Sequence, residues 1–304
     1  MELRQLRYVE AVDRHRHFTR AAEELHVAQP ALSHQIRRLE AELGTELFER
    51  TSRSVVTTEA GEAVAARART VLAEVDGVRG EIDELNGLIR GRISIGALLP
   101  AGAIDMPSLV GRFSEAHPGI DIDLHEGTAG DMLRYLAEDE VHAAFSLLAG
   151  PLPEGLAGER LSEDELVAAF PPGDAPGRGP VPAKRLLDYP IVLPRSGSAI
   201  KQAADEFFAA AGQSARVALE SGDPFLLRCL VASGFGAAIL PRSLTRREGP
   251  PVEVRGLRPT VRLPVMLLWR ERRHVSPAAR AFIDFVRAEV GVSGGARRSR
   301  SGSG

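Results

Sequence analysis

Residues 27–43 read VAQPALSHQIRRLEAEL, and this stretch decides the fold of the amino-terminal part of the chain. Large apolar side chains recur there at steps of four, three and four residues. At 100° per residue that spacing forms one narrow buried stripe on a helix. The stripe is Leu32, Ile36, Leu39 and Leu43, and the residues on the other side are Pro30, Ser33, His34, Arg37 and Arg38. The pattern predicts a helix that packs on one side and can enter a DNA major groove with the other.

Two shorter helices are predicted before this one. Leu3, Leu6 and Val9 have amphipathic spacing, and Thr19 offers a hydroxyl as the N-cap of a second helix, TRAAEEL. Residues 26–28 then form the short turn of a helix-turn-helix. Any three-helix packing unit would show the same periodicity, so the spacing alone leaves DNA binding open.

A strand pair is predicted directly after the three helices. Residues 47–50 (LFER) and 54–58 (SVVTT) are joined by a short polar turn. A hairpin in this place is typical of a wing, whose tip would carry Arg50 and Arg53. Their guanidinium groups suit a phosphate or a narrow minor groove, and a solvated hairpin is the alternative.

The order of these blocks resembles the LysR-type transcriptional regulators. The matching blocks are LRQLRYVEAV (3–12), FTRAAEELHVAQPALSHQIRRLEAELG (18–44), LFERTSR (47–53) and TEAG (58–61). The resemblance extends weakly to about residue 290. It implies an α/β protein with a winged helix-turn-helix, a long linker helix and a two-lobed, Rossmann-like effector domain similar to periplasmic binding proteins.

Two residues of the recognition segment depart from the family pattern. Ala28 stands where a serine often caps the helix, a loss worth ~1 kcal/mol. His34 stands where arginine is frequent, which replaces a permanent cation by a mostly neutral ring. We expect base-edge contacts from Gln29, Pro30, Ser33, His34 and Arg37, and phosphate or minor-groove contacts from Thr19, Arg38, Arg50 and Arg53.

Net charge gives no support for strong non-specific DNA binding. Residues 1–58 contain nine arginines and nine acidic residues, and the whole chain carries a formal charge of −3. A basic surface can therefore arise only if charges segregate in space.

A heptad pattern begins after residue 58. Thr58 is a plausible N-cap, and a helix of about thirty residues would span ~45 Å. Apolar residues follow steps of four and three, which favours pairing with a second helix over packing on the same chain. The expected dimer seam is Val64, Ala68, Val71, Val75, Val78, Ile82, Leu85 and Ile89. Such a dimer would hold two recognition helices on a quasi-palindromic site.

Strands and helices alternate in the remainder of the chain. Asn86-Gly87 and Arg90-Gly91-Arg92 break the helical pattern and place a hinge between 86 and 91. Predicted strands are 92–96, 120–125, 141–147, 166–170, 190–193, 216–220, 236–240 and 264–270, and a last helix covers about 276–290. The expected domains are 1–58 (winged helix-turn-helix), 59–90 (linker helix), 91–292 (effector domain) and 293–304 (disordered tail). Lobe one would be 92–162 plus 266–292, and lobe two 163–265.

Several loops of the effector domain match positions of family effector contacts. They precede predicted helices, whose free N–H groups favour anions, although helix capping alone explains the same residues. The expected contacts are Pro100, Ala101, Thr128, Ala129, Arg195, Ser196, Ser198 and Asp223. Pro100 replaces a residue that is often serine or threonine, so we expect an effector less polar than the family's usual acids, or none.

Two other classes of protein compete with a regulator. Ser198 and Lys201 have the S-x-x-K spacing of serine acyltransferases, but a capping serine followed by an exposed lysine explains the pair. A ligand-binding protein without DNA function is opposed by the amino-terminal third. His15 and His17 lie among arginines, which suits solvent or phosphate better than a metal. We expect no enzyme activity, no metal site and no cofactor.

Cys229 is the only cysteine and lies in an apolar run, so we expect a buried thiol and no intramolecular disulfide switch. The chain shows no transmembrane stretch and no signal-peptide core, which predicts a cytoplasmic protein away from membranes. The predicted partners are double-stranded DNA, a small-molecule effector, further copies of the chain as a homodimer or homotetramer, and RNA polymerase. Activation or repression, the target genes and the effector's identity stay open.

Overall fold

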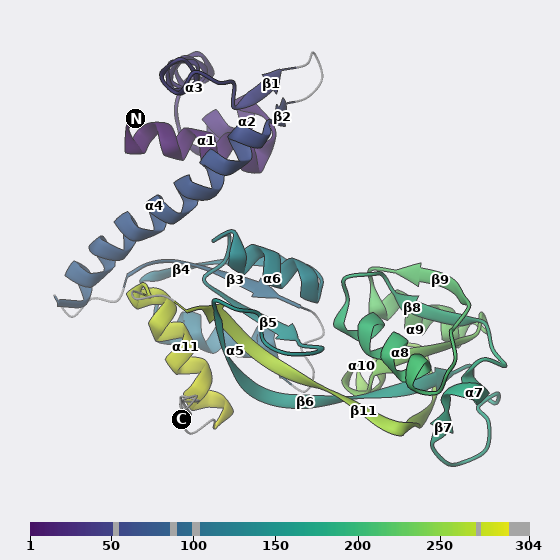
Figure 1. Cartoon of the computed structure of the whole chain (residues 1–304). Helices are drawn as coiled ribbons and strands as arrows, with labels where there is room; N and C mark the ends of the chain where they lie inside the picture. Colours follow the sequence, from purple (N-terminus) through teal and green to yellow (C-terminus); the bar gives the residue numbers. More distant parts are fainter. Residues whose placement is uncertain (51–54, 86–89, 99–103, 272–274, 292–304) are drawn as a thin grey trace, which may run out of the picture. The chain divides into compact units, whose positions relative to one another are not determined.

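The protein consists of two compact units, each with its own hydrophobic core. The computed structural model describes residues 1–50, 55–85, 90–98, 104–271 and 275–291 (Figure 1). The first unit is built mainly from Met1–Gly91, and the second from the part of the chain that follows. Within the described residues, no helix is both long and apolar enough to cross a bilayer.

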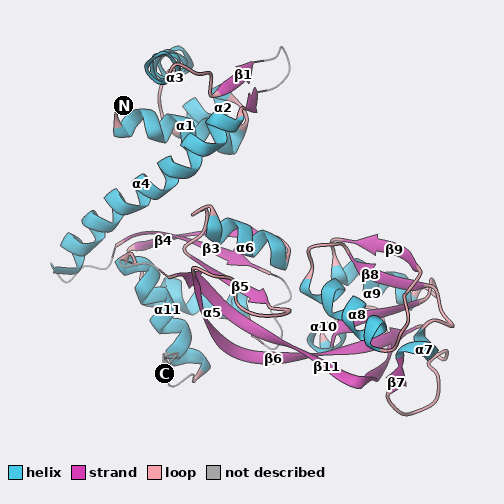
Figure 2. Ribbon diagram, viewed as in Figure 1, coloured by secondary structure: helices cyan, strands magenta, loops and turns pink. Residues whose placement is uncertain are grey.

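The first unit contains three short helices, a strand pair and one long helix (Figure 2). The strands are antiparallel, with Phe48 opposite Thr57. This order of elements confirms the predicted winged helix-turn-helix and linker helix. The elements are α1 (Leu3–His15), α2 (Phe18–Glu24), α3 (Gln29–Leu43), β1 (Phe48–Arg50), β2 (Val55–Thr57) and α4 (Glu59–Leu85).

The core of the first unit forms where the apolar stripes of α1 and α3 pack together, although Leu3 at the start of the α1 stripe is 46% exposed. Phe18 of α2 closes this core against Phe48 of β1, edge to face, with ring centroids 5.9 Å apart. Burial of each large aliphatic side chain stabilises the fold by roughly 1.5–3 kcal/mol. The fully buried aliphatic residues of the two stripes are Val9, Val12, Leu32, Ile36 and Leu39. This packing fixes which side of α3 faces outward.

The second unit is built on one mixed sheet with strand order β4-β3-β5-β11-β6-β10-β8-β9, and β7 lies beside β11. The strands are β3 (Gly91–Ala97), β4 (Ile120–Glu126), β5 (Ala143–Leu147), β6 (Leu156–Phe170), β7 (Val181–Pro182), β8 (Ile191–Pro194), β9 (Val217–Ser221), β10 (Ala237–Pro241) and β11 (Glu253–Arg270). The helices are α5 (Met106–Ala116), α6 (Ala129–Ala137), α7 (Ala183–Leu186), α8 (Ala199–Ala210), α9 (Pro224–Ala232), α10 (Arg242–Arg246) and α11 (Pro277–Val290).

Strands β6 and β11 are the longest of the sheet and lie next to each other in its middle. They pair antiparallel from Glu253 opposite Phe170 to Arg270 opposite Leu156. Both are far longer than the predicted strands 166–170 and 264–270, so those two predictions are wrong in extent. The register of the pair shifts next to Val265, which faces Ser162. That irregularity supports the lobe crossovers near 162 and 265, which stay a prediction.

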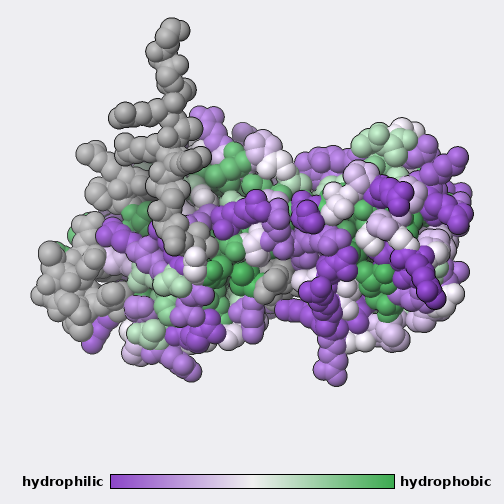
Figure 3. All heavy atoms as spheres, turned by 90° about the horizontal axis from the view of Figure 1, so that it is seen from below, coloured by the Kyte–Doolittle hydropathy of each residue, from purple (hydrophilic) through white to green (hydrophobic). Residues whose placement is uncertain are grey.

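Hydrophilic residues cover most of the described part of the face drawn in Figure 3, with smaller hydrophobic areas between them. Among the described residues, the large apolar side chains that remain exposed include three on α4, which are Val71, Val78 and Ile82. Two more, Phe225 and Leu226, lie in the first turn of α9. Most large apolar side chains of the described residues are therefore at least partly buried, with exceptions such as those on α4 and α9.

Candidate nucleic-acid interface and ligand site

Helix α3 begins without a side-chain cap and ends at a glycine. Its N-cap residue, Ala28, makes no capping hydrogen bond, as expected from the missing hydroxyl. Pro30 lies in the first turn, where its missing N–H costs nothing. Gly44 ends the helix with φ +71°, a conformation that glycine adopts without strain.

The outer side of α3 carries most of the residues expected to read bases. Pro30, His34, Arg37 and Arg38 are exposed and Gln29 is half-buried, and we call these five residues the reading face. Two predictions about this helix are wrong. Ser33 is only 4% exposed, because it lies at the edge of the buried stripe and has a small side chain. Leu43 is 38% exposed, because the last turn of α3 extends past the core.

Helix α2 starts one residue before Thr19, and its cap is a histidine. The Nδ1 atom of His17 accepts hydrogen bonds from the backbone N–H groups of Thr19 (3.2 Å) and Arg20 (3.5 Å). Thr19 as the N-cap is therefore wrong, although its side chain is exposed and stays a candidate phosphate contact. The two strands of the predicted wing are present, while Arg53 and the side chain of Arg50 lie outside the described residues.

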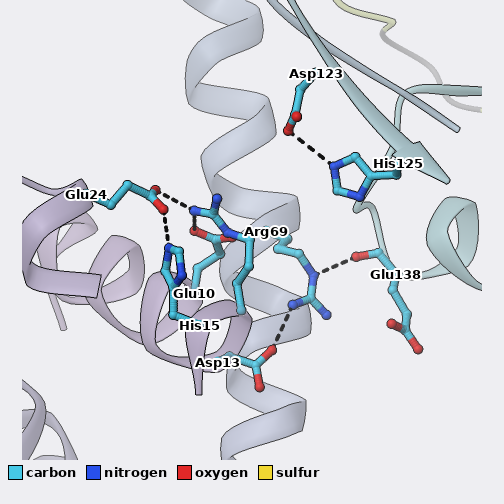
Figure 4. A network of polar contacts seen from close by, with 9 residues as sticks. Glu10, Asp13, His15, Glu24, Arg69, Asp123, His125 and Glu138 are labelled. Carbon is cyan, nitrogen blue, oxygen red and sulfur yellow. Dashed lines mark hydrogen bonds and ion pairs between the residues drawn. The ribbon is translucent and has the colours of Figure 1, made fainter. Parts of the chain in front are cut away.

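A cluster of charged side chains joins α1 to α2 (Figure 4). Arg14 pairs with Glu10 (3.1 Å) and with Glu24 (2.6 Å), and Glu24 also pairs with His15. Burial raises the pKa of Glu24, but the hydrogen bonds from His15 and Arg14 outweigh it and lower the pKa overall. His15 is thus tied to a carboxylate and half-buried, which corrects the expectation that it is solvated or near phosphate, whereas His17 caps α2 and is exposed as expected.

The predicted dimer seam on α4 divides into two parts. Ala68 is fully buried within its own chain, so it is wrong as a seam residue. Val64 is half-buried against the core of the first unit, and Val75 is also half-buried. Val71, Val78 and Ile82 are 41%, 62% and 55% exposed. The side chain of Leu85 and all of Ile89 lie outside the described residues. Thr58 caps the helix as expected, since its Oγ1 accepts from Gly61 N (3.0 Å).

Thr128 and Asp131 form a closed capping arrangement at the start of α6. The backbone N–H and the hydroxyl of Thr128 both donate to Asp131 Oδ2, at 2.9 and 2.8 Å. In return, Asp131 N donates to Thr128 Oγ1 at 3.2 Å. The backbone hydrogen bond from Thr128, helped by Arg134, lowers the pKa of Asp131 against the effect of burial. The T-x-x-D spacing is typical of this capping motif. Sequence reasoning nevertheless missed Asp131.

The structure brings the loop that holds Thr128 and Ala129 into contact with the loop that holds Ser196 and Ser198. Gly130 N donates to Gly197 O at 3.0 Å, so the start of α6 contacts the turn before α8. A Cβ atom on Gly130 would lie 3.2 Å from that oxygen, and only glycine permits this approach without a shift. Ala129 is buried in the same cluster as residues of α8. Sequence reasoning missed Gly130, because a close contact between distant segments leaves no local signal.

The other expected effector contacts act mainly as helix caps in this structure. Ser198 caps α8 by accepting from Ile200 N (3.2 Å), and Asp223 caps α9 by accepting from Phe225 N (2.8 Å). Arg195 and Ser196 are exposed beside them. Pro100 and Ala101 lie outside the described residues. The capping alternative raised from the sequence therefore has direct support at Ser198 and Asp223.

The lone thiol and the histidines give no further chemistry among the described residues. Cys229 is half-buried rather than buried, because it faces away from the core side of α9 that holds Leu227 and Val231. No group of three or more His, Cys, Asp or Glu side chains in the described ranges could hold a metal ion.

Two family models account for almost the whole chain. Residues 3–62 match the bacterial regulatory helix-turn-helix protein, lysR family, and residues 86–291 match the LysR substrate binding domain. The chain belongs to the LysR family. This LysR-type regulator is 33% identical over 299 residues to the RuBisCO operon transcriptional regulator of Allochromatium vinosum, covering 95% of this chain and 97% of that protein.

Solved structures agree with this LysR-type architecture. A full-length OxyR variant from Pseudomonas aeruginosa is 26% identical, with a TM-score of 0.73 and coverage of 94% of this chain and 95% of that one. Full-length CbnR in complex with its target DNA is 26% identical, with a TM-score of 0.65 and coverage of 95% and 99%. The expected fold is thus confirmed, and the protein is a DNA-binding transcriptional regulator with a ligand-sensing domain.

Proposed function

We propose that this LysR-type regulator reads a quasi-palindromic DNA site with the reading face of α3, presented twice by a homodimer. One observation carries the proposal: the apolar stripe of α3 is buried while Pro30, His34 and Arg37 on the opposite side are exposed. A helix so divided can enter a major groove without disturbing its own packing. RNA polymerase stays a predicted partner because the family regulates transcription.

Footprinting tests this proposal directly. The purified full-length protein is placed on DNA upstream of its own gene and of the nearest divergent gene, at two salt concentrations. We expect protection of a dyad-symmetric site that extends over several helical turns. Absence of protection at both salt concentrations contradicts the proposal.

The His34→Arg variant tests the reading face itself. It adds a permanent cation, so we expect tighter binding and a steeper salt dependence, by about 0.9 in the logarithmic slope if one more phosphate is neutralised. His26→Arg is the matched control, because it adds the same cation in the turn before α3, away from the reading face. Equal effects of the two variants would mean that only general charge matters.

The exposed apolar residues of α4 support pairing with a second copy. Val71, Val78 and Ile82 follow one another at heptad-compatible steps, and each side chain is more than 40% exposed. A Val75→Asp, Val78→Asp double variant should split the dimer and abolish binding to a two-half-site DNA. Sedimentation that still shows a dimer would refute the seam. The same measurement on the wild type separates a dimer from a tetramer.

We further propose that a small molecule binds near Thr128, Ser196 and Ser198, and that it is not a hydrophilic dicarboxylate. The backbone N–H and hydroxyl of Thr128 already donate to Asp131, and Gly130 N donates to Gly197 O, which supports a less polar ligand. Calorimetry with succinate is expected to show no binding heat, and saturable binding would count against the proposal.

The contacts of Ser198 and Lys201 favour capping over acyl transfer. Ser198 is engaged by Ile200 N, and Lys201 Nζ pairs with Asp205 at 2.6 Å. We therefore propose a regulator without acyl-transfer activity. An assay with nitrocefin and a simple ester should show no hydrolysis above that of a Ser198→Ala variant.

A further inference from the structure

Asp13 lies where three elements of the first unit meet. It belongs to the last turn of α1, and its side chain is 11% exposed. Its Oδ1 accepts a hydrogen bond from Thr57 Oγ1 of β2 at 2.9 Å and pairs with Arg16 at 3.3 Å. Its Oδ2 pairs with Arg69 Nη1 of α4 at 3.2 Å (Figure 4). One carboxylate of α1 therefore contacts β2 of the predicted wing and the linker helix α4.

The ion pair between Asp13 and Arg69 is shielded on both sides. The Arg69 side chain is 13% exposed, so both partners are largely removed from water. A charge-assisted hydrogen bond in such surroundings is stronger and more directional than a pair on the open surface, and loss of one partner strands the other. The pair can therefore stabilise one direction of α4 relative to α1.

The position of Arg69 along α4 determines how much of the helix the ion pair can orient. Ala65 and Ala68 are fully buried just before it, whereas Val71 just after it is 41% exposed. The pair thus lies where the fully buried residues of α4 end, since Val75 further along the helix is only half-buried. Ile82 follows Arg69 by 13 residues, which is about 20 Å of helix.

A small change of helix direction at this point has a large effect further along. Over about 20 Å, a rotation of about 10° moves the far end by roughly 3.5 Å, close to the rise of one base pair. The exposed part of α4 is the proposed dimer seam. The distance between the two recognition helices therefore depends on the angle at which α4 leaves each domain.

We propose that Asp13 is a positioning residue that sets this angle and thereby the half-site spacing the dimer prefers. Asp13 itself contacts no base in this assignment and acts through Arg69 and Thr57. The inference rests on the proposed dimer on a two-half-site DNA.

The test compares DNA spacers rather than affinity alone. The full-length wild type and the Asp13→Asn and Arg69→Gln variants are titrated on the footprinted site, on versions with one base pair added or removed between the half-sites, and on a single half-site. Glu23→Gln and Arg67→Gln are matched controls, since Glu23 and Arg67 are exposed residues of the same unit. Unfolding midpoints are measured for all five proteins.

We expect both variants to bind the native spacing about tenfold more weakly than the wild type and to lose most of its preference among spacers. Binding to the single half-site should stay within about twofold, and the controls should behave as the wild type. A spacer preference that survives in Asp13→Asn overturns the inference, even if the unfolding midpoint falls. A parallel loss on the half-site also overturns it, because Asp13 would then act on the domain's stability. Failure of the wild type to bind any of these DNAs would instead refute the proposed function.

Discussion

Replacing Arg228 by methionine tests how a buried cation held by backbone carbonyls stabilises the second unit. Arg228 in α9 is 4% exposed. Its guanidinium donates to four backbone carbonyls, one in α10 and three in the segment that follows it. The acceptors are Leu244 (2.9 Å), Arg247 (2.7 Å), Gly249 (3.3 Å) and Pro250 (2.9 Å).

The magnitude follows from how far water can reach these acceptors. The contact with Leu244 is buried and the other three are partly buried, so water replaces the guanidinium at three of them. A hydrogen bond to a charged group contributes about 1.5–3 kcal/mol, and a stranded buried acceptor costs about 1–3 kcal/mol. Methionine recovers about 1 to 2 kcal/mol of apolar burial. With the hydrogen bond to Leu244 alone counted as lost, because water replaces the other three, the expected net loss in the free energy of unfolding is about 3 kcal/mol.

Urea unfolding followed by tryptophan fluorescence measures this loss in the correct unit. Trp269 is the only tryptophan and lies in β11, in the same unit as Arg228. With a slope near 2 kcal/mol per molar urea, the midpoint should fall by about 1.5 M. Arg216→Met, at an exposed position, should change the free energy by less than about 0.5 kcal/mol. A loss below about 1 kcal/mol in Arg228→Met would refute the reasoning.

Two further predictions concern the second unit. Hydrogen bonds from Arg242 hold the pKa of Glu165 below its ordinary 4.5, against the effect of burial, so the pair stabilises the fold above that pH. This stabilisation is lost as the pH falls through the lowered pKa, and Glu165→Gln should flatten the acid limb of the thermal-unfolding profile. Gly130→Ala should speed hydrogen exchange at its own amide, because the new Cβ would lie 3.2 Å from Gly197 O. Gly111→Ala, in α5 with open space around it, should instead raise the free energy of unfolding by about 0.5–1 kcal/mol and leave hydrogen exchange at its own amide unchanged. Equal changes in hydrogen exchange in the two variants would contradict the contact between Gly130 and Gly197.

Sequence periodicity predicted the elements whose burial is decided locally. The stripe of α3, the strand pair after it and most strands of the second unit lie within a few residues of their expected places. Ser33 shows the limit of this approach. A small polar residue beside an apolar stripe is covered by neighbouring helices, and no count of apolar spacing reveals that.

The long strands β6 and β11 could not be predicted from local pattern. Their outer halves alternate charged and apolar residues, and β11 contains Pro259 and Pro264, which argue against a central strand. Pairing with each other, about 100 residues apart in the chain, extends both strands beyond their predicted ranges. The contact of Gly130 with Gly197 and the ion pair of Asp13 with Arg69 could not be predicted for the same reason, since each joins segments that are distant in sequence.

The place of β11 in the sheet has a consequence for the order in which the chain folds during synthesis. β11 is the last strand to leave the ribosome, yet it lies between β5 and β6 in the interior of the sheet. β5 and β6 therefore lack the strand that lies between them until about residue 270 has been synthesised. The core of the winged helix-turn-helix uses residues from Tyr8 to Ala65 and can form long before. A nascent chain thus acquires its means of reading DNA before its means of sensing a ligand.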